Sequence, residues 1–546
     1  MRLSSRTSLR LLLAGLLASS SSYADETRVF EAAVTKEGPD HLLIPFTVPA
    51  DIEEILYEHQ SLGETDVLDF GLLREGEFRG WGGGLKEPAT LTKKEASRGY
   101  LPGPIAGNWS IVIGKAKLLT ANPRYKVTIT LRTKQTLPPQ VRKPYVSSPP
   151  LKQEARFYAM DFHVHSRESG DASPDLETIA KFAESVGLDA VEISDHNTIS
   201  HLDYFAEVQA KHPNLLFVPG IEYTTYAGHA NAIGTTKWGD HKIGLQGLTI
   251  DTPLAAFRQG GALIAINHPA LDLGTSCTGC AWKHANDPKN VDAVEISTGD
   301  IETIGSLFLR NSLLFWEDLA RKGIHAAAIG GSDDHDGGAG DESKSVIGQP
   351  TTMVFAENLS VAALLDGIRK GKTVVKTHDV KDPMIVLSPN VAVDDRATIR
   401  AKSVVFSANI FPVPRLAKVR LVKNGEPIVE RDLAQGDSSV QLFEAIAPGT
   451  GEDFYRVEVL VDAQRRAITS HMFLRGDEGG PDGISEAAGT LSGAGLGCAN
   501  GNTSIVSRAA ATSSEGGPVD LRNVLGLAGL GALVFALRRK RPSSER

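Results

Sequence analysis

The feature that most constrains the fold is an alternation of two hydrophobic patterns in the middle of the chain. From Phe157 to about His378, short apolar runs rich in β-branched residues alternate with segments whose apolar residues recur at helical spacing. Strands alternating with helices are typical of βαβ units, and about seven such units predict a closed or nearly closed parallel barrel. Barrels of this kind carry their active sites at the carboxyl ends of the strands.

The elements of this region have recognisable boundaries. One helix is expected to begin with Ser173 as N-cap and Pro174 at its first position, and to end at Gly187. Its apolar stripe comprises Leu176, Ile179, Ala180 and Ala183. The expected strands are Phe157 to His163, Leu188 to Ser194, Leu215 to Glu222, Ala262 to Asn267, Val291 to Ser297 and Ala326 to Ser332.

Segments with β-type patterns flank the predicted barrel. Short β-rich runs separated by Gly and Pro clusters precede it, and a proline-rich linker joins the two parts. After the barrel the β pattern returns, with Asn424-Gly425 as the turn of a hairpin. The sequence thus predicts an α/β protein in which a closed or nearly closed barrel lies between two β-sandwich domains. The expected segments are a β-sandwich over 25–144, a linker over 145–156, the barrel over 157–380 and a second β-sandwich over 381–475.

Both ends of the chain carry expected targeting signals. Residues 1–24 combine three arginines with a short apolar run and small residues at the end, as cleavable secretory signals do. A Gly/Ser/Ala-rich tether is expected over 476–520, and a transmembrane anchor or sorting signal over 521–546, where an apolar run is followed by Arg538-Arg539-Lys540-Arg541. Cys498 in the tether is either a processing or lipid-attachment site or an uninvolved thiol. The folded domains are therefore expected to be exported and to lie in the cell envelope or at the cell surface.

Charge and cysteine content exclude two classes of protein. The 57 Lys and Arg residues are outnumbered by 66 Asp and Glu residues, which gives a formal net charge of −9. This balance argues against a nucleic-acid partner, and a small anionic substrate would need locally bound positive charge. Three cysteines in 546 residues cannot form a disulfide framework.

Histidine and carboxylate side chains gather where the expected strands end. His163 and His165 form a His-x-His pair whose imidazoles lie on one face of an extended segment. Imidazole mixed with carboxylate, without thiolate, suits Zn, Mn or Fe. The sequence therefore predicts a centre that binds divalent metal. The other candidate residues at or near strand ends are Asp171, His196, Glu222, His229, His268, Glu295, Asp333 and His335.

Five ordered motifs in this region resemble the PHP (polymerase and histidinol phosphatase) superfamily of metallohydrolases, whose fold is a distorted seven-stranded (β/α) barrel. They are residues 161–166 (DFHVHS), 194–198 (SDHNT), 220–222 (GIE), 267–269 (NHP) and 331–335 (GSDDH). Two further motifs, 99–104 (GYLPGP) and 277–282 (CTGCAW), resemble a narrower group, the CehA/McbA-type metallohydrolases, which include carbaryl hydrolase.

The resemblance implies a set of ligands for each ion. One ion is expected on His163, His165, Glu222 and Asp333, a second on the bridging Glu222 with His229 and His268, and a third on Asp171, His196 and His335. Asp171 stands where some members have His, as in members with two metals, so the number of ions stays open between two and three. Glu295 has no ligand role in the family and is expected to act structurally or near the substrate.

The predicted activity is hydrolysis of a small-molecule ester by metal-activated hydroxide. His335 or His229 is expected to donate a proton to the leaving group if its ring is not fully committed to metal. A phosphoesterase is the first expectation and a carbamate or carboxylic ester hydrolase the alternative. A non-catalytic surface binding protein is a second alternative. Cys277 and Cys280 could form a local disulfide, a further metal site or simply the edge of a loop, and we favour a disulfide or paired thiols that stiffen a substrate loop.

Overall fold

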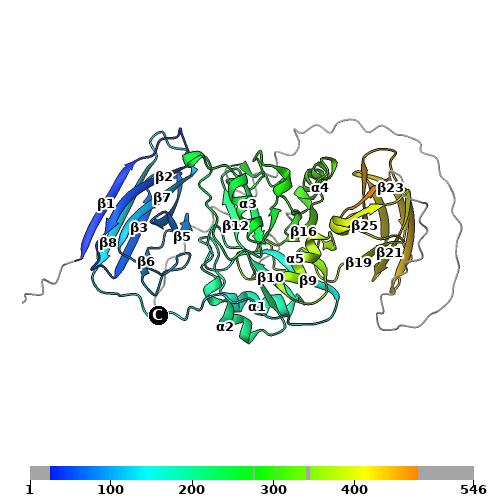
Figure 1. The fold of residues 1–546 in the computed structure, drawn as a ribbon, viewed down its shortest axis with the longest axis horizontal. Helices are drawn as coiled ribbons and strands as arrows, with labels where there is room; N and C mark the ends of the chain where they lie inside the picture. The colour runs from blue at the N-terminus through cyan, green and yellow to red at the C-terminus, as the bar shows by residue number, and fades with distance from the viewer. Residues whose placement is uncertain (1–24, 275–276, 304, 340–344, 477–546) are drawn as a thin grey trace, which may run out of the picture.

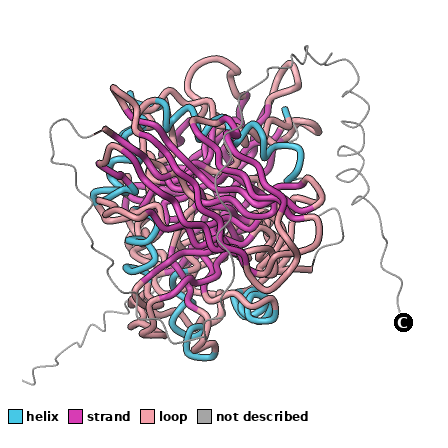
Figure 2. Tube along the Cα trace, turned by 90° about the vertical axis from the view of Figure 1, so that its right-hand side faces the viewer, coloured by secondary structure: helices cyan, strands magenta, loops and turns pink. Residues whose placement is uncertain are grey.

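The computed structural model describes residues 25–274, 277–303, 305–339 and 345–476, which form a sheet-rich mixed α/β structure (Figure 1). Three predicted segments lie outside the described residues: the signal segment, nearly all of the tether including Cys498, and the anchor. Among the helices of the described ranges, none has the length and apolarity needed to cross a membrane. Figure 2 shows the strands at the centre of the molecule and the helices around them.

The N-terminal region consists of two antiparallel four-stranded sheets, with strand orders β1-β8-β3-β6 and β2-β7-β4-β5. Buried residues alternate along β8, and those of both sheets, such as Ile55, Ile111 and Ile129, form one hydrophobic cluster. The strands are β1 Glu26–Ala33, β2 His41–Val48, β3 Glu54–Ser61, β4 Val67–Arg74, β5 Glu77–Gly83, β6 Ala89–Thr92, β7 Gly107–Lys117 and β8 Arg124–Arg132.

The central region alternates strands and helices along much of its length, as the sequence pattern predicts, but β11, β12 and β13 follow one another without an intervening helix. α4 packs against β15, α3 against β14 and α5 against β17. The strands are β9 Arg156–Val164, β10 Ala190–Ile193, β11 Leu216–Pro219, β12 Glu222–Thr225, β13 Gly228–Ile233, β14 Leu263–Ile266, β15 Ala293–Thr298, β16 Ala327–Gly331, β17 Thr351–Ala356 and β18 Thr373–Lys376. The helices are α1 Leu176–Ser185, α2 Leu202–Lys211, α3 Asp251–Gln259, α4 Gly305–Arg321 and α5 Val361–Arg369.

Most predicted strand ends are shifted by only one or two residues, and two boundaries differ in a way that matters for the site. The N-cap of α1 is Asp175 rather than Ser173, because the Asp175 carboxylate accepts the backbone N–H of Thr178 at 2.8 Å. Glu222 begins β12 instead of ending the preceding strand, since that strand, β11, ends at Pro219. The chain between them passes from one sheet to another.

The central strands are not all parallel, which corrects the predicted parallel barrel. The pairs β9–β10, β10–β11, β14–β15 and β15–β16 are parallel, whereas β12–β13, β13–β14, β9–β17 and β17–β18 are antiparallel. Only Tyr226 and Ala227 separate β12 from β13, and so short a connection permits a hairpin but no crossover. The strands fall in two sheets, and isolated bridges join Val164 to Asp334 and His196 to Glu222. A closed barrel thus stays a prediction.

The C-terminal region continues the central sheet. β26 pairs with β18, so one sheet runs β11-β10-β9-β17-β18-β26-β25-β22-β23, and β19-β21-β24 form a second sheet. The predicted hairpin turn at Asn424-Gly425 lies between β22 and β23, and both residues have positive φ. The strands are β19 Met384–Pro389, β20 Thr398–Arg400, β21 Ser403–Phe411, β22 Ala417–Lys423, β23 Glu426–Asp432, β24 Ser439–Ile446, β25 Glu452–Val461, β26 Gln464–Thr469 and β27 Met472–Arg475.

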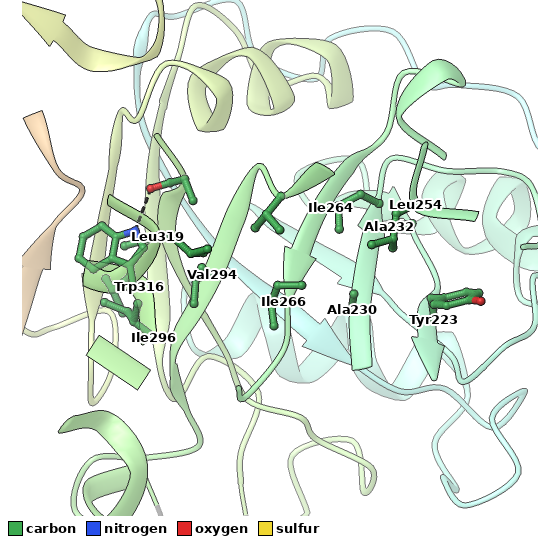
Figure 3. Packing of buried hydrophobic residues seen from close by; sticks show 14 of the residues in the cluster. Tyr223, Ala230, Ala232, Leu254, Ile264, Ile266, Val294, Ile296, Trp316 and Leu319 are labelled. Atoms are coloured by element: carbon green, nitrogen blue, oxygen red, sulfur yellow. Dashed lines mark hydrogen bonds between the residues drawn. The ribbon is translucent and has the colours of Figure 1, made fainter. Parts of the chain in front are cut away.

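The core of the central region explains its continuous apolar strands. Along β14, Ile264 and Ile266 belong to the cluster that also includes residues of α3 and α4, whereas Leu263 and Ala265 belong to the cluster on the other face. Figure 3 shows the first cluster, where Trp316 donates its indole N–H to the carbonyl of Ala326 at 2.8 Å. This packing fixes the strands whose ends carry the candidate site.

Candidate metal centre

The end of β9 places the His-x-His pair against the end of β16. The backbone N–H of His165 donates to the carbonyl of Asp334 at 2.9 Å, and that of Asp333 donates to the carbonyl of His163 at 2.8 Å. Both imidazoles reach the Asp333 carboxylate, since each Nε2 lies 3.2 Å from its Oδ1. Residues 170 positions apart in the chain thereby form one side of the centre.

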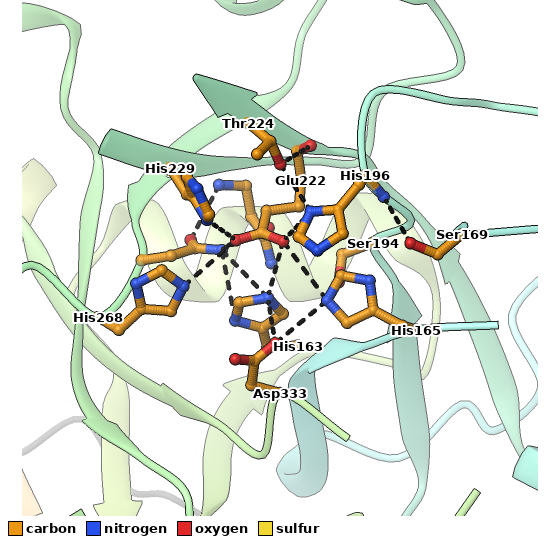
Figure 4. A network of polar contacts seen from close by, with 12 residues as sticks. His163, His165, Ser169, Ser194, His196, Glu222, Thr224, His229, His268 and Asp333 are labelled. Atoms are coloured by element: carbon orange, nitrogen blue, oxygen red, sulfur yellow. Dashed lines mark hydrogen bonds and ion pairs between the residues drawn. The ribbon is translucent and has the colours of Figure 1, made fainter. Parts of the chain in front are cut away.

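Glu222 lies at the middle of the centre, and its fully buried carboxylate faces five imidazoles (Figure 4). β12 and β13 form the hairpin that brings His229 beside it, and the bridge between Glu222 and His196 brings the second imidazole. Oε1 lies 2.9 Å from Nδ1 of His229 and 3.3 Å from Nε2 of His268; Oε2 lies 2.7 Å from Nδ1 of His196 and 3.4 Å from Nε2 of both His163 and His165.

Asp171 joins two imidazoles at the outer edge of the centre. Its Oδ2 lies 3.3 Å from Nε2 of His196 and 3.4 Å from Nε2 of His335. The Asp171 side chain is 55% exposed, in contrast to the buried Glu222. This part of the centre is therefore the one open to solvent.

Three overlapping groups of donor atoms have the spacing of metal ligands, with all atoms of a group within 4.8 Å of one another. The first matches the set expected for one ion. The other two regroup the expected ligands, because His196 joins Glu222 and His229 in place of His268, and His165 joins His196 and His335 in place of Asp171. The groups are His163, His165, Glu222 and Asp333; His196, Glu222 and His229; and His165, His196 and His335. The structure thus brings all nine predicted ligands together, while their assignment to individual ions stays a prediction.

A second layer of side chains orients these ligands. His163 donates its Nδ1–H to Oε2 of Glu295 at 3.1 Å, and Glu295 also accepts the backbone N–H of His268 at 3.2 Å. A carboxylate behind an imidazole fixes the ring and leaves its other nitrogen for a metal. Asn267 lies beside them, with its amide nitrogen 3.3 Å from Glu222. The role of Glu295 was left open by the sequence, and Asn267 was missed, although both are polar residues within apolar strand patterns.

The charges around the two histidines of β9 move their pKa values in opposite directions. Burial disfavours the charged ring of His163, but the carboxylates of Asp333, Glu222 and Glu295 outweigh burial and raise its pKa. For His165, burial together with His335 and His196 lowers the pKa to about 4. A neutral imidazole is the form that binds metal.

The donor set fits divalent cations. Several buried polar atoms of the centre make no well-aligned hydrogen bond, although Nε2 of His165 and Oε2 of Glu222 lie within ion-pair distance of other ligands. Burying such atoms is costly unless a cation or water satisfies them. They are Nδ1 and Nε2 of His165, Nε2 of His229 and Oε2 of Glu222. Neutral imidazole and carboxylate suit divalent cations such as Zn, Mn and Fe, and the identity and number of the ions stay predictions.

A further group with ligand spacing, Asp300, Glu302 and His378, is instead an ion-pair cluster. His378 donates from Nδ1 to Asp300 at 2.7 Å, and Arg466 donates to Glu302 at 2.8 Å. The guanidinium of Arg466 already supplies positive charge there.

The N-terminal region also contributes to the surroundings of the centre. Tyr226, in the turn between β12 and β13, donates its hydroxyl to Oδ2 of Asp69 on β4 at 2.7 Å. Burial raises the pKa of Asp69 to about 6, while the Tyr226 hydroxyl and His196 oppose that rise. The backbone N–H of Gly99 donates to Glu168 at 3.0 Å, on the loop that leads to Asp171. Asp69 was not among the candidate residues, since it lies in a β pattern far from the motifs.

Comparisons with known proteins give only limited likeness. No family model matches the chain, and no curated protein matches it. A candidate metal-dependent phosphoesterase from Bifidobacterium adolescentis is 14% identical with a TM-score of 0.24, covering 34% of this chain and 92% of that protein. An amidohydrolase from Chromobacterium violaceum, with bound sulfate and no metal, is 15% identical with a TM-score of 0.23, covering 32% and 87%. The CARDB domain of a Pyrococcus furiosus protein, in complex with two metal ions, is 12% identical with a TM-score of 0.14, covering 18% and 97%.

Proposed function

We propose that the protein is a metal-dependent hydrolase, and that it acts as a phosphoesterase on small phosphomonoesters or phosphodiesters. The observation that carries the proposal is the buried Glu222 carboxylate, which belongs to two overlapping ligand groups and contacts imidazoles of both. Divalent ions in such a centre supply Lewis-acid polarisation of the substrate and a lowered pKa of water. Bound cations also supply the local positive charge that an anionic phosphoester needs on an acidic protein.

The residues of the chain have separate tasks in this proposal. Glu295 and the Cys280 carbonyl orient His163 and His268, and Glu222 holds neighbouring ligand groups at a fixed spacing. Of the two proposed proton donors, the His335 side chain is 26% exposed and that of His229 is 7% exposed. A leaving group therefore reaches His335 more easily, and we favour His335 as the donor.

A carbamate or carboxylic ester hydrolase is the second candidate. Both motifs that resemble the narrower CehA/McbA-type group lie beside the centre: Gly99 donates to Glu168, and the Cys280 carbonyl contacts His268. Their position favours a role in substrate choice.

The decisive experiment compares two assays on one metal-loaded preparation. A panel of phosphomonoesters and phosphodiesters is tested beside an aryl carbamate and an aryl ester, with the His163→Ala/His165→Ala variant as the control for contaminating activity. Phosphate release that the variant lacks supports the first candidate, and carbamate or ester cleavage alone supports the second. Metal binding without turnover of any substrate would instead favour the non-catalytic alternative.

Export and anchoring belong to this proposal as well. They depend on residues 1–24 and on the apolar segment within 521–546, whose basic end would remain in the cytoplasm. Deleting residues 524–546 is expected to release active enzyme into the soluble fraction. Continued membrane association of the shortened protein would contradict the anchor.

A further inference from the structure

The disulfide between Cys277 and Cys280 contacts the metal centre through a backbone carbonyl. The carbonyl oxygen of Cys280 lies 2.9 Å from Nδ1 of His268, and both residues are buried. On its other side, the His268 ring presents Nε2 to Oε1 of Glu222 at 3.3 Å. His268 is thus held between a carbonyl and the central carboxylate.

This contact determines the tautomer of His268. A carbonyl oxygen only accepts hydrogen bonds, so Nδ1 must carry the proton. In the neutral imidazole Nε2 then holds the lone pair, and it faces Glu222. In many metal sites a backbone carbonyl accepts a hydrogen bond from a ligating histidine and so orients its ring. Losing that hydrogen bond typically lowers metal affinity by 10-fold to 100-fold.

The backbone at His268 depends on this support. Its φ is +28°, in the left-handed region that is strained for a non-glycine residue. Surrounding contacts must therefore hold the conformation.

Backbone hydrogen bonds join the segment after the disulfide to the chain beside two of the predicted ligands, His268 and His229. The backbone N–H of Trp282 donates to the carbonyl of Pro269 at 3.1 Å, directly after His268. The N–H of Lys283 donates to the carbonyl of Ala227 at 2.7 Å, in the turn that precedes His229. Gly279, with φ +83°, lies so close to Thr225 and Tyr226 that a β-carbon there would be 2.2 Å from the Thr225 carbonyl oxygen. The four-residue loop closed by the disulfide therefore packs directly on the β12–β13 hairpin.

We propose that the Cys277–Cys280 disulfide is a positioning element of the metal centre, which makes the metal affinity of the ligands around His268 depend on the redox state of this cysteine pair. The disulfide holds the Cys280 carbonyl in place, the carbonyl holds His268, and His268 presents Nε2 to the centre. The inference rests on the metal centre and does not depend on which ester is hydrolysed.

The redox change itself is simple thiol chemistry. A phosphine reductant breaks the S–S bond, the two sulfur atoms take up two protons from water, and the phosphine takes the oxygen and becomes a phosphine oxide. A phosphine is preferable to a dithiol in the test because thiolates bind zinc themselves.

The experiment measures Zn²⁺ content and affinity, not turnover. Full-length protein is compared as wild type, as wild type treated with phosphine, and as the Cys277→Ser/Cys280→Ser variant, each titrated with Zn²⁺ against a chromophoric chelator. Reduction and the double substitution are each expected to lower the affinity of about one equivalent of Zn²⁺ by 10-fold to 100-fold, and reoxidation of the wild type is expected to restore it. The Cys498→Ser variant is the matched control, and it should respond to phosphine like the wild type.

Two further arms test the route of the effect. In a His268→Ala background the Cys277→Ser/Cys280→Ser change should have no additional effect on affinity, because a coupling that runs through His268 is already lost. Phosphine should likewise leave the affinity of the Cys277→Ser/Cys280→Ser variant unchanged. Thermal unfolding of the metal-free proteins separates a loss of fold from a loss of ligand geometry.

Undiminished Zn²⁺ affinity after complete reduction of the wild type would overturn the proposal. The proposal would also be overturned if the Cys277→Ser/Cys280→Ser change lowered Zn²⁺ affinity equally in the wild-type and His268→Ala backgrounds. A protein that binds zinc in this redox-dependent way and yet cleaves no ester would refute the proposed function while leaving this inference intact.

Discussion

Glu295 accepts the Nδ1–H of His163 at 3.1 Å across 132 positions of sequence. Both side chains are buried, and Thr298 donates its hydroxyl to the other carboxylate oxygen at 2.9 Å. Glu295, which is not a predicted ligand, thus fixes the ring of His163, which is one.

Substituting Glu295 should therefore weaken metal binding although Glu295 is not expected to bind the ion. Glu295→Ala removes the acceptor, and we expect a 10-fold to 100-fold loss of metal affinity at the group that contains His163. Thr298→Val, which removes only the hydroxyl donor to Glu295, should have a smaller effect. Isothermal titration with Zn²⁺ measures both, and equal affinities for all three proteins would show that the contact is dispensable.

Replacing both His163 and His165 with Ala should abolish turnover and remove about one equivalent of bound metal. Both rings face Asp333 and Glu222, so their loss leaves that group with carboxylates alone. Elemental analysis and circular dichroism of the same samples check metal content and fold. Full metal content with retained activity would refute the ligand assignment.

Removing divalent ions should lower thermal stability. Ions that bind the folded state contribute about 2.7 kcal/mol when free metal is 100 times the Kd. Chelator-treated protein is therefore expected to unfold at a lower temperature, with recovery on adding Zn²⁺, Mn²⁺ or Fe²⁺. Differential scanning calorimetry over a metal series measures this, and a transition unaffected by any of these ions would argue against a metal centre.

Asp189, which accepts hydrogen bonds from the start of β9, should make the free energy of unfolding depend on pH. Burial favours its neutral form, but hydrogen bonds from Arg156, Lys152 and the Ala159 N–H outweigh burial and lower its pKa. Since the folded pKa lies below the unfolded value of about 3.9, the stabilisation is present above that pH and is lost as the pH falls through the folded pKa. Asp189→Asn should cost about 1–3 kcal/mol at pH 7 and progressively less below pH 4.

The matched control for Asp189 is Asp366→Asn. Asp366 pairs with Lys370 one turn along α5, and both side chains are less than half exposed. Such a pair contributes about 0.5 kcal/mol or less. Urea unfolding at pH 7 and pH 3 compares the variants, and a penalty for Asp189→Asn that does not change with pH would contradict the ionic explanation.

Local signals in the sequence predicted several individual elements. The apolar stripe from Leu176 to Ala183 predicted α1, Asn424-Gly425 predicted the hairpin of β22 and β23, and the His-x-His spacing placed two imidazoles on one face. These predictions succeeded because a helix, a tight turn and an extended pair are determined by residues a few positions apart. The α1 cap was misplaced because Ser173 and Asp175 are both good caps, and only the folded chain shows which one accepts a bond.

The chemistry of the centre was also contained in the sequence, since the nine predicted ligands are the side chains that the structure brings together. The tertiary structure alone decided how they are grouped, that β12 and β13 form a hairpin, that the C-terminal strands extend the central sheet, and that Glu295 and the Cys280 carbonyl orient two of the histidines. Residue type and spacing fix which donor atoms a chain offers. The distances between those atoms depend on contacts between distant segments, and such contacts arise only when the sheets pack.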